Sequence, residues 1–557
     1  MARQKDNTEN KNLEIALTLS GGGYRASIFH IGVLSYLDHL TLDDGSSFLD
    51  HVTVMSTVSG GTITGMLYLL SLEDDGDVMT HLNKMYHSVV DNNLAEMLLK
   101  KIDKKRNDKK LSVIKELGNV YDDVFFRNLR LGKLFEIVQN SHVHHYAAYA
   151  TDISNAMPFR FQVAKEVYGN LKVGNDAVII EKESAHNLRL ADVMAASSCF
   201  PIAFEPINYP RDFIDYDEND EAAQSELQTM LMDGGIVDNQ GVDYLLEANR
   251  QMTANGEDKL DGIDVAIISD AASSTGDLPD SDVNKVKFVW WKRLLQFLYR
   301  SVFPMPWLFS ELKFLSVKQL QMMFCIVAVF YFVVSFYNYR DFAFFCIGYA
   351  IASFFCSYLI LICLAKHKTP QNLKSSNQFA IPKDLIWNIT FNQYYRIISK
   401  RYASFSKVVS TVMMGHIRKK NMEMLETNSR WTNRFVIPCI QTLTSNGCWK
   451  SDKMAKTLMA SATDLMKISD EASNFHSTLW FSQADNDNKL PQKILACGQF
   501  SICYELYLWI LKHSGNQPNM PKVLNQLKAK SVKKQLEDDW KAFKVDPYML
   551  TGQIINT

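Results

Sequence analysis

The sequence predicts an α/β protein whose central sheet is mainly parallel. Residues 13–20 alternate and are rich in aliphatic side chains, as expected of a strand, and three glycines end the run. Residues 24–40 then repeat apolar side chains at helical spacing. Residues 51–58 read as a second strand, which ends at a Ser-Gly-Gly turn and leads into an apolar helix. A strand, a tight turn and a helix, repeated in order, are typical of a parallel sheet covered by helices.

Length and composition exclude several classes of protein. The chain has 557 residues, more than one ordinary domain, with 47% apolar and 22% charged side chains. Its net charge of −2 gives no overall attraction to nucleic acid, so no nucleic-acid partner is expected. Residues 1–12 are polar and lack the apolar core of a signal peptide, which predicts a cytosolic N-terminus. The nine cysteines include no Cys-x-x-Cys pair, which favours free thiols in a reducing compartment.

Two long apolar runs follow the α/β part of the chain. Residues 322–338 are 17 uncharged residues and residues 342–365 are 24, separated by the short polar hinge Tyr339-Arg340-Asp341. Each run can cross the ~30 Å of hydrocarbon in a bilayer. The sequence therefore predicts a transmembrane helical hairpin at 322–365; the alternative is a helical hairpin buried in a soluble core.

Flanking charge predicts the orientation of this hairpin. Lysines at 313 and 318 precede it and lysines at 366 and 368 follow it, so both ends are expected to face the cytosol. The prediction is an integral membrane protein with two passes, whose termini and α/β domain are cytosolic. Residues 281–321, with tryptophans and basic side chains, are interpreted as an amphipathic interfacial segment.

The other predicted regions are a polar tail at 1–12, the α/β domain at 13–280, a helical region at 366–470, and a C-terminal helix and tail at 516–557. Residues 100–110 carry seven basic and two acidic side chains. Such a run most often marks a solvated loop or helix face, and contact with a membrane surface is the alternative.

A glycine-rich loop joins the first predicted strand to its helix. Gly21, Gly22 and Gly23, followed by Arg25, bring backbone N–H groups and a helix N-terminus to one place, which favours negative charge. Such a loop suits either a phosphate or the oxyanion of an acyl-transfer reaction. The loop also fits the loose GxGxxG/A dinucleotide pattern, but the chain has no GxxxxGK[ST] phosphate loop.

The Ser-Gly-Gly turn after the second predicted strand favours acyl transfer over phosphate binding. Ser59 stands where a strand passes into a helix, a position that exposes its hydroxyl, and the N–H of Gly60 can serve as an oxyanion donor. A dinucleotide-binding protein has no need of this feature. The alternative is a serine that caps the following helix.

A serine hydroxyl needs an adjacent base, and none of the thirteen histidines stands out as that base. Asp233 ends an apolar strand and precedes two glycines. An aspartate at such a strand end points into the cleft where open α/β sheets bind ligands, although an ordinary Asp-Gly turn reads the same way.

Three motifs together resemble the patatin-like phospholipases and their cytosolic phospholipase A relatives: SGGGYRA, VSGGT and MDGG, in that order. Residues 149–161 and 195–207 are also similar to the family, so the resemblance spans about residues 13–245. It implies a three-layer fold and a Ser–Asp dyad without a catalytic histidine. Ser59 would be the nucleophile, Asp233 the base, the three loop glycines the oxyanion site, and Arg25 an assisting residue.

The chain departs from the family pattern at Thr57, where the first glycine of the serine turn would stand.

A later stretch also resembles the family. Residues 477–500 are similar to the C-terminal part of such catalytic domains, so residues 471–515 are interpreted as a return to the catalytic domain, with the hairpin as an insertion.

The sequence thus predicts a membrane-anchored lipid acyl hydrolase, similar to phospholipase A or lysophospholipase, acting on membrane lipid through an acyl-enzyme. Neither a metal nor an organic cofactor is expected. The alternatives are a catalytically inactive scaffold or lipid-binding protein, with Thr57 as a sign of decay, and a nucleotide-binding regulator that uses the first glycine loop. The sequence does not decide between a monomer and a homodimer.

Overall fold

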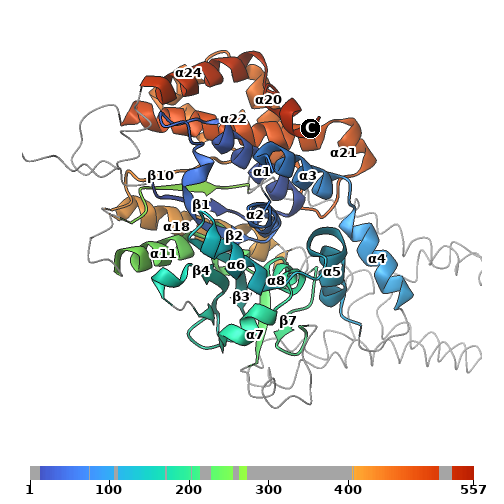
Figure 1. Cartoon of the computed structure of the whole chain (residues 1–557). Coiled ribbons are helices and arrows are strands. Elements are labelled where there is room, and N and C mark those ends of the chain that lie inside the picture. The colour runs from blue at the N-terminus through green and yellow to red at the C-terminus, as the bar shows by residue number, and fades with distance from the viewer. Residues whose placement is uncertain are drawn as a thin grey trace, which may run out of the picture. The chain divides into compact units, whose positions relative to one another are not determined.

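The computed structural model describes residues 13–271 and 404–556, apart from residues 75, 106–110, 170–171, 202, 214–227, 255–261, 406, 429 and 514–529. The described residues up to 271 and from 408 onward belong to one compact unit (Figure 1). The predicted polar tail, interfacial segment and membrane hairpin lie outside the described residues, so all three stay predictions.

The described strands form one mixed sheet of ten. In chain order they are β1 (Ile15–Leu19), β2 (Val52–Val58), β3 (His145–Asp152), β4 (Met157–Ala164), β5 (Val173–Gly174), β6 (Ile179–Ile180), β7 (Ile207–Tyr209), β8 (Thr229–Asp233), β9 (Val265–Ser269) and β10 (Phe435–Val436). Their order in the sheet is β10-β9-β1-β2-β3-β4-β5-β6, and β8 pairs with β3 and β7. The strands from β10 to β3 run parallel, which confirms the predicted mainly parallel sheet.

Helices cover both faces of this sheet (Figure 1). They are α1 (Gly23–His39), α2 (Gly60–Ser71), α3 (Val78–Val90), α4 (Leu94–Lys104), α5 (Val113–Tyr121), α6 (Leu131–Asn140), α7 (Lys182–Asn187), α8 (Leu190–Ser197), α10 (Gly235–Asp238), α11 (Val242–Ala254), α18 (Met414–Thr427), α19 (Lys453–Leu458), α20 (Thr463–Asn474), α21 (Gln483–Asp487), α22 (Leu490–Lys512), α24 (Lys530–Val545) and α25 (Thr551–Ile555).

Alternate side chains of β1 enter two different cores. Ile15 and Leu17 join the larger core with apolar residues of α1 and α22, whereas Ala16 joins the smaller core with residues of α11 and α18. Every position of β1 and β2 is buried, as expected of strands with helices on both faces. The architecture is therefore three layers, helix on sheet on helix.

The helix α22 lies in the larger core. Among the described helices it alone is long and apolar enough to cross a membrane, judged by length and composition. However, 89% of the residues in its most apolar stretch are buried inside the unit. It crosses α1 where Gly32 meets Gly498. A Cβ on Gly32 would come within 2.2 Å of the Leu495 carbonyl oxygen, and one on Gly498 within 2.1 Å of the Phe29 carbonyl oxygen. The two glycines thus allow the backbones to touch, and α22 is a core helix of this unit.

The C-terminal segment also packs into the core. Trp540 of α24 is only 2% exposed, lies 5.2 Å from the Tyr504 ring between centroids, and donates its indole N–H to the Leu458 carbonyl oxygen. The sequence suggested a C-terminal helix and tail. The many lysines of α24 make this segment look polar in the sequence, although its apolar face packs on α22.

We expect Gly32→Ala to lower the free energy of unfolding by about 1–3 kcal/mol, since an added methyl group overpacks this helix contact. Thermal unfolding of the detergent-purified protein measures the change. Gly552→Ala in α25 is the matched control, because the nearest atom to its new Cβ is an Asn556 side-chain nitrogen at 3.6 Å. Equal melting temperatures for the two variants would contradict the close contact of α1 with α22.

Candidate active site

The glycine loop between β1 and α1 presents open backbone donors. Gly22 and Gly23 have φ of 148° and 58°, which other residues rarely adopt, and a Cβ on Gly23 would lie 2.4 Å from the Thr478 carbonyl oxygen. The N–H of Gly21 donates to the Asn239 carbonyl oxygen at 3.1 Å, and that of Tyr24 donates to Thr478 O at 2.8 Å. The N–H groups of Gly22 and Gly23 donate to no described residue. Of the three predicted loop glycines, these two therefore offer free donors.

Ser59 stands on a strained turn between β2 and α2. Its φ of 49° and ψ of −120° are rare for a residue with a side chain. The turn leaves no room at the next residue, since a Cβ on Gly60 would lie 2.2 Å from the Gly23 carbonyl oxygen. The Ser59 N–H donates to the Ser197 hydroxyl at 3.0 Å, which helps to hold the turn. The N–H of Gly60 remains open beside those of the glycine loop.

Thr57, the departure from the family pattern, is accommodated by a glycine on α2. Its hydroxyl donates to the Ala147 carbonyl oxygen at 3.2 Å and lies 3.1 Å from the Tyr146 hydroxyl. Its methyl carbon lies 2.4 Å from the position that a Cβ on Gly65 would take. Gly65 thus provides the space that a glycine at 57 would otherwise provide, and the turn at Ser59 forms.

Asp233 reaches the same level of the sheet from the opposite direction. Val58 pairs with Tyr149, and the next residue of β3, Ala150, pairs with Asp233. Asp233 ends the strand β8, as the sequence predicts, and this strand runs antiparallel to β3. It nevertheless lies level with Ser59, because β8 ends where the parallel strands end.

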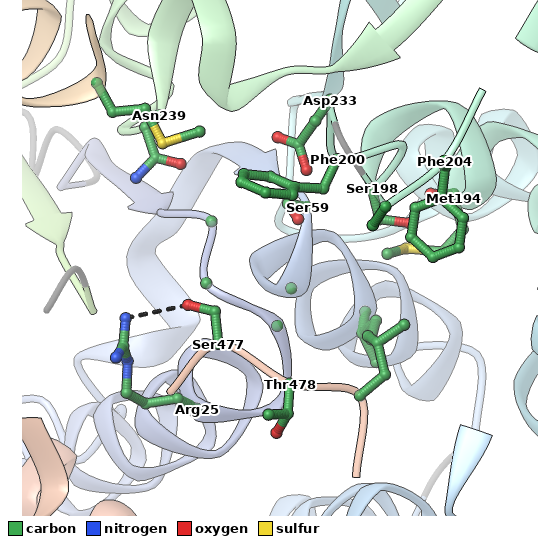
Figure 2. Close-up of a pocket in the computed structure, with 18 of the residues that line it drawn as sticks. Arg25, Ser59, Met194, Ser198, Phe200, Phe204, Asp233, Asn239, Ser477 and Thr478 are labelled. Atoms are coloured by element: carbon green, nitrogen blue, oxygen red, sulfur yellow. Dashed lines mark hydrogen bonds between the residues drawn. The ribbon is translucent and has the colours of Figure 1, made fainter. Parts of the chain in front are cut away.

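The Asp233 carboxylate is buried beside Ser59. Burial raises the pKa of Asp233 to about 6, against hydrogen bonds from the Gly235 N–H and the Ser59 hydroxyl, which lower it. The Gly235 N–H donates to the carboxylate at 2.7 Å. Figure 2 shows Asp233 and Ser59 together at the pocket. The geometry therefore gives Ser59 a partner able to accept its proton near neutral pH.

Arg25, which follows the glycine loop, connects it to two other segments of the chain. Its guanidinium donates to the carbonyl oxygens of Ala271, at 3.0 Å, and of Phe475, and to the Ser477 hydroxyl at 3.3 Å (Figure 2). Burial lowers the pKa of Arg25 to about 10, so it stays charged at neutral pH. Its donors join the loop to the end of β9 and to the segment before α21.

A cavity of about 420 Å³ contains all of the predicted site residues, Ser59, Asp233, Gly60, Arg25 and the three loop glycines. Most of the remaining wall is apolar, formed by Ile63, Met194, Phe200, Ala203, Phe204, Met414, Leu479 and Trp480. Its residues come from both halves of the chain. Such a pocket suits a long apolar substrate group placed next to a few polar atoms.

No histidine belongs to the described lining of this pocket. His416 and His476, which follow Asp233 in the chain, are both exposed. His30, which the sequence did not single out, is a histidine that contacts the residue before the glycine loop. It lies below the glycine loop, 2.9 Å from the Ser20 carbonyl oxygen and 2.7 Å from the Ser269 hydroxyl. Burial lowers its pKa to about 4, so it is a neutral support of the loop.

Ser197 and Asn239 were also missed. Ser197 accepts the Ser59 N–H, and Asn239 lines the cavity and accepts the Gly21 N–H through its carbonyl oxygen. Both residues lie in or next to stretches that resemble the family, but nothing in the sequence singles out either residue itself. Their contacts depend on pairing between distant segments, which spacing along the chain does not reveal.

The fold and the site define an α/β protein with a serine on a strained strand-to-helix turn, a buried aspartate beside it and a glycine loop with open donors. The model of the patatin-like phospholipase family matches residues 17–246, so this part of the chain is a patatin-like phospholipase domain, as the three motifs predict.

Solved structures with a similar arrangement include human GIVD cytosolic phospholipase A2. The match has a TM-score of 0.32 and 13% identity, and covers 55% of this chain and 48% of that one. The same human protein in complex with methyl gamma-linolenyl fluorophosphonate matches with a TM-score of 0.25 and 16% identity, over 35% of this chain and 31% of that one. The chain thus spans about half the length of the first of these structures. No curated protein matches the chain.

We expect Gly65→Ala to lower the free energy of unfolding by about 1–3 kcal/mol and to reduce the reactivity of Ser59, because the new methyl group meets the Thr57 methyl carbon. Thr57→Ser keeps the hydroxyl and removes that carbon, so the double variant Thr57→Ser/Gly65→Ala is expected to recover most of both losses. Thermal unfolding and fluorophosphonate labelling measure the two effects. Additive losses in the double variant would rule out the accommodation of Thr57 by Gly65.

Proposed function

We propose that this protein is a membrane-anchored lipid acyl hydrolase, similar to phospholipase A or lysophospholipase, that releases free fatty acid from glycerolipids. The single observation that carries the proposal is Ser59, held at φ 49° beside the buried Asp233 in a mostly apolar pocket. The patatin-like domain supports the same reaction class.

In the first half-reaction Ser59 Oγ attacks the ester carbonyl carbon and its proton passes to Asp233. The N–H groups of Gly22, Gly23 and Gly60, which donate to no described residue at the pocket, would stabilise the negative charge that develops, and each such donor contributes about 3 kcal/mol to lowering the barrier. Asp233 then gives its proton to the departing alcohol oxygen, which leaves an acyl-enzyme on Ser59.

In the second half-reaction water attacks the acyl carbon and gives a proton to Asp233. Collapse of the tetrahedral intermediate returns that proton to Ser59 Oγ and releases the fatty acid. One carboxylate thus serves both halves, and a pKa of about 6 suits it to accept and donate protons near neutral pH.

Arg25 contributes by position in this proposal. Each of its three guanidinium nitrogens donates a hydrogen bond to the protein, which favours a role in holding the glycine loop over one in binding a lipid phosphate. It adds to the Tyr24 N–H to Thr478 O hydrogen bond in joining the loop to the 475–478 segment.

Two other functions compete with this one. A catalytically inactive scaffold or lipid-binding protein would keep the fold and the pocket without turnover. The main argument for it is Thr57 as a sign of decay, and the space at Gly65 that accommodates Thr57 weakens that argument. A nucleotide-binding regulator would use the glycine loop for phosphate, and it would leave the strained Ser59 and the apolar wall without a purpose.

The wild-type protein is expected to react covalently with an alkyl fluorophosphonate and to release fatty acid from detergent-dispersed phospholipid, because Ser59 is the nucleophile. Ser59→Ala should abolish both, while Ser141→Ala, a change outside the pocket lining, should keep both. In-gel fluorescence and mass spectrometry of the lipid products give the readouts. A wild-type protein that neither labels nor hydrolyses would exclude the enzyme and leave the scaffold.

The rate of hydrolysis is expected to fall as the pH drops through about 6, since the Asp233 carboxylate must be ionised to accept the Ser59 proton. Asp233→Asn should lose turnover by about a thousandfold or more, as removal of a general base from an acyl hydrolase does. The pH dependence of kcat/KM provides the test. A profile that is flat between pH 5 and about 8 would contradict the role of Asp233.

The same pKa makes a prediction about stability. Because the folded pKa of about 6 lies above the ordinary 3.8, the folded state holds the Asp233 proton more tightly, and this contribution to stability is lost as the pH rises from about 4 to 6. Asp233→Asn is therefore expected to raise the free energy of unfolding at pH 7 by up to about 3 kcal/mol, at 1.36 kcal/mol per pKa unit. Chemical unfolding at pH 5 and pH 7 measures it, and a destabilised variant at pH 7 would contradict the buried charge.

We also propose that residues 322–365 anchor the protein as a two-pass hairpin with the termini and the catalytic domain in the cytosol. The two uncharged runs and the flanking lysines support this. A tag at either end should be digested by protease in sealed cytosol-side-out vesicles. Protection of either tag would overturn the topology.

A further inference from the structure

Asn239 is a pocket residue that the acyl transfer described above does not use. Its side chain is 8% exposed and lines the cavity, at the end of the short helix α10. The side-chain amide makes no hydrogen bond with any residue that the structure describes. A buried amide without a protein partner loses hydrogen-bond energy unless water or a ligand supplies one.

The backbone on each side of Asn239 is fixed by side chains. The Asp238 carboxylate accepts the Gln240 N–H at 3.1 Å and the Asn421 side-chain amide at 2.9 Å. The Gln240 side-chain amide donates to Asp270 at 2.9 Å. The two neighbours are thus anchored, and only the Asn239 amide is left facing the cavity. Such a held but unpaired polar group is typical of a preorganised substrate contact.

The Asn239 side-chain oxygen lies close to two glycines, Gly21 and Gly235, which are also next to Ser59 and Asp233. The point where a Cβ on Gly21 would stand is 2.5 Å from Asn239 Oδ1 and 3.2 Å from Ser59 Cβ. The corresponding point on Gly235 is 2.6 Å from Asn239 Oδ1 and 3.0 Å from Asp233 Oδ1. The amide therefore borders both the nucleophile and the base, and Figure 2 shows it on the side of Asp233 away from Phe204.

We propose that Asn239 is a further catalytic residue, whose side-chain amide holds the oxygen atom that exchanges a proton with Asp233. In acylation this atom is the alcohol oxygen of the departing glycerol backbone. In deacylation it is the oxygen of the attacking water. The inference rests on the acyl transfer proposed above.

The chemistry of a two-residue dyad requires such a contact. In deacylation the water oxygen forms the new bond to the acyl carbon, one water proton passes to Asp233, and the bond from that carbon to Ser59 Oγ then breaks as Oγ takes the proton. A site water needs two to four polar partners to stay in one orientation. Asp233 supplies one, and the Asn239 amide, which carries both a donor and an acceptor, supplies the next.

The test separates the two half-reactions with a p-nitrophenyl ester, whose leaving group departs as an anion without needing a proton. Asn239→Leu is expected to acylate at close to the wild-type rate and to deacylate about tenfold to a hundredfold more slowly, the loss of one hydrogen bond in a desolvated site. Stopped-flow release of p-nitrophenolate should then show a burst equal to the enzyme concentration, followed by a slow phase. Mass spectrometry should show the acyl group on the variant. Asn140→Leu, at an exposed position on α6, is the matched control and should keep the wild-type rates of both acylation and deacylation.

Each outcome decides the inference. A variant that turns over at the wild-type rate, or one in which acylation and deacylation slow equally, would overturn it. Loss of fluorophosphonate labelling in both Asn239→Leu and Asn239→Ala would assign the residue a structural role and also overturn it. Failure of the wild-type protein to label would instead reject the proposed function itself, so the two failures are distinguishable.

Discussion

The close approach of two backbone turns is the constraint on which the rest of this site depends. The turn at Ser59 lies against the glycine loop so tightly that no side chain fits on Gly60. Hydrogen bonds lock the helices that follow, since the Ser27 hydroxyl donates to Gly60 O at 2.8 Å and the Thr64 hydroxyl donates to Ser27 O at 3.0 Å. Adjacent parallel strands bring both helix N-termini to one place, so their open N–H groups surround the serine.

Segments from the second half of the chain complete this arrangement. The glycine loop binds the backbone of residues 475–478, and Arg25 joins the same segment to the end of β9. From α18, Arg418 pairs with the buried Asp270 at 3.1 Å, directly before Ala271. Residues of α18 thus line the pocket, and Ala271, the last described residue before the predicted membrane segment, accepts a hydrogen bond from the pocket residue Arg25.

Burial sets the charges in the pocket. It raises the pKa of Asp233 to about 6 and lowers that of His30 to about 4, so the aspartate titrates near neutral pH while the histidine stays neutral. In the proposed reaction the apolar wall would therefore act twice, since it would receive the acyl chain and it contributes to the desolvation that raises the pKa of Asp233.

The sequence by itself determined the local features of this protein. Strand periodicity and the glycine turns predicted β1, α1, β2 and α2, because these features depend on residues adjacent in the chain. The same local turns pointed to Ser59 and the glycine loop, which the structure brings together in one pocket. The role of Asp233 came from family resemblance, and the antiparallel direction of β8 was not visible because strand pairing is non-local. Only the tertiary structure decided that Gly65 accommodates Thr57, that α22 is a core helix and that Asn239 borders the dyad. Each of these facts depends on contacts between residues far apart in the chain, whose register a one-dimensional pattern does not contain.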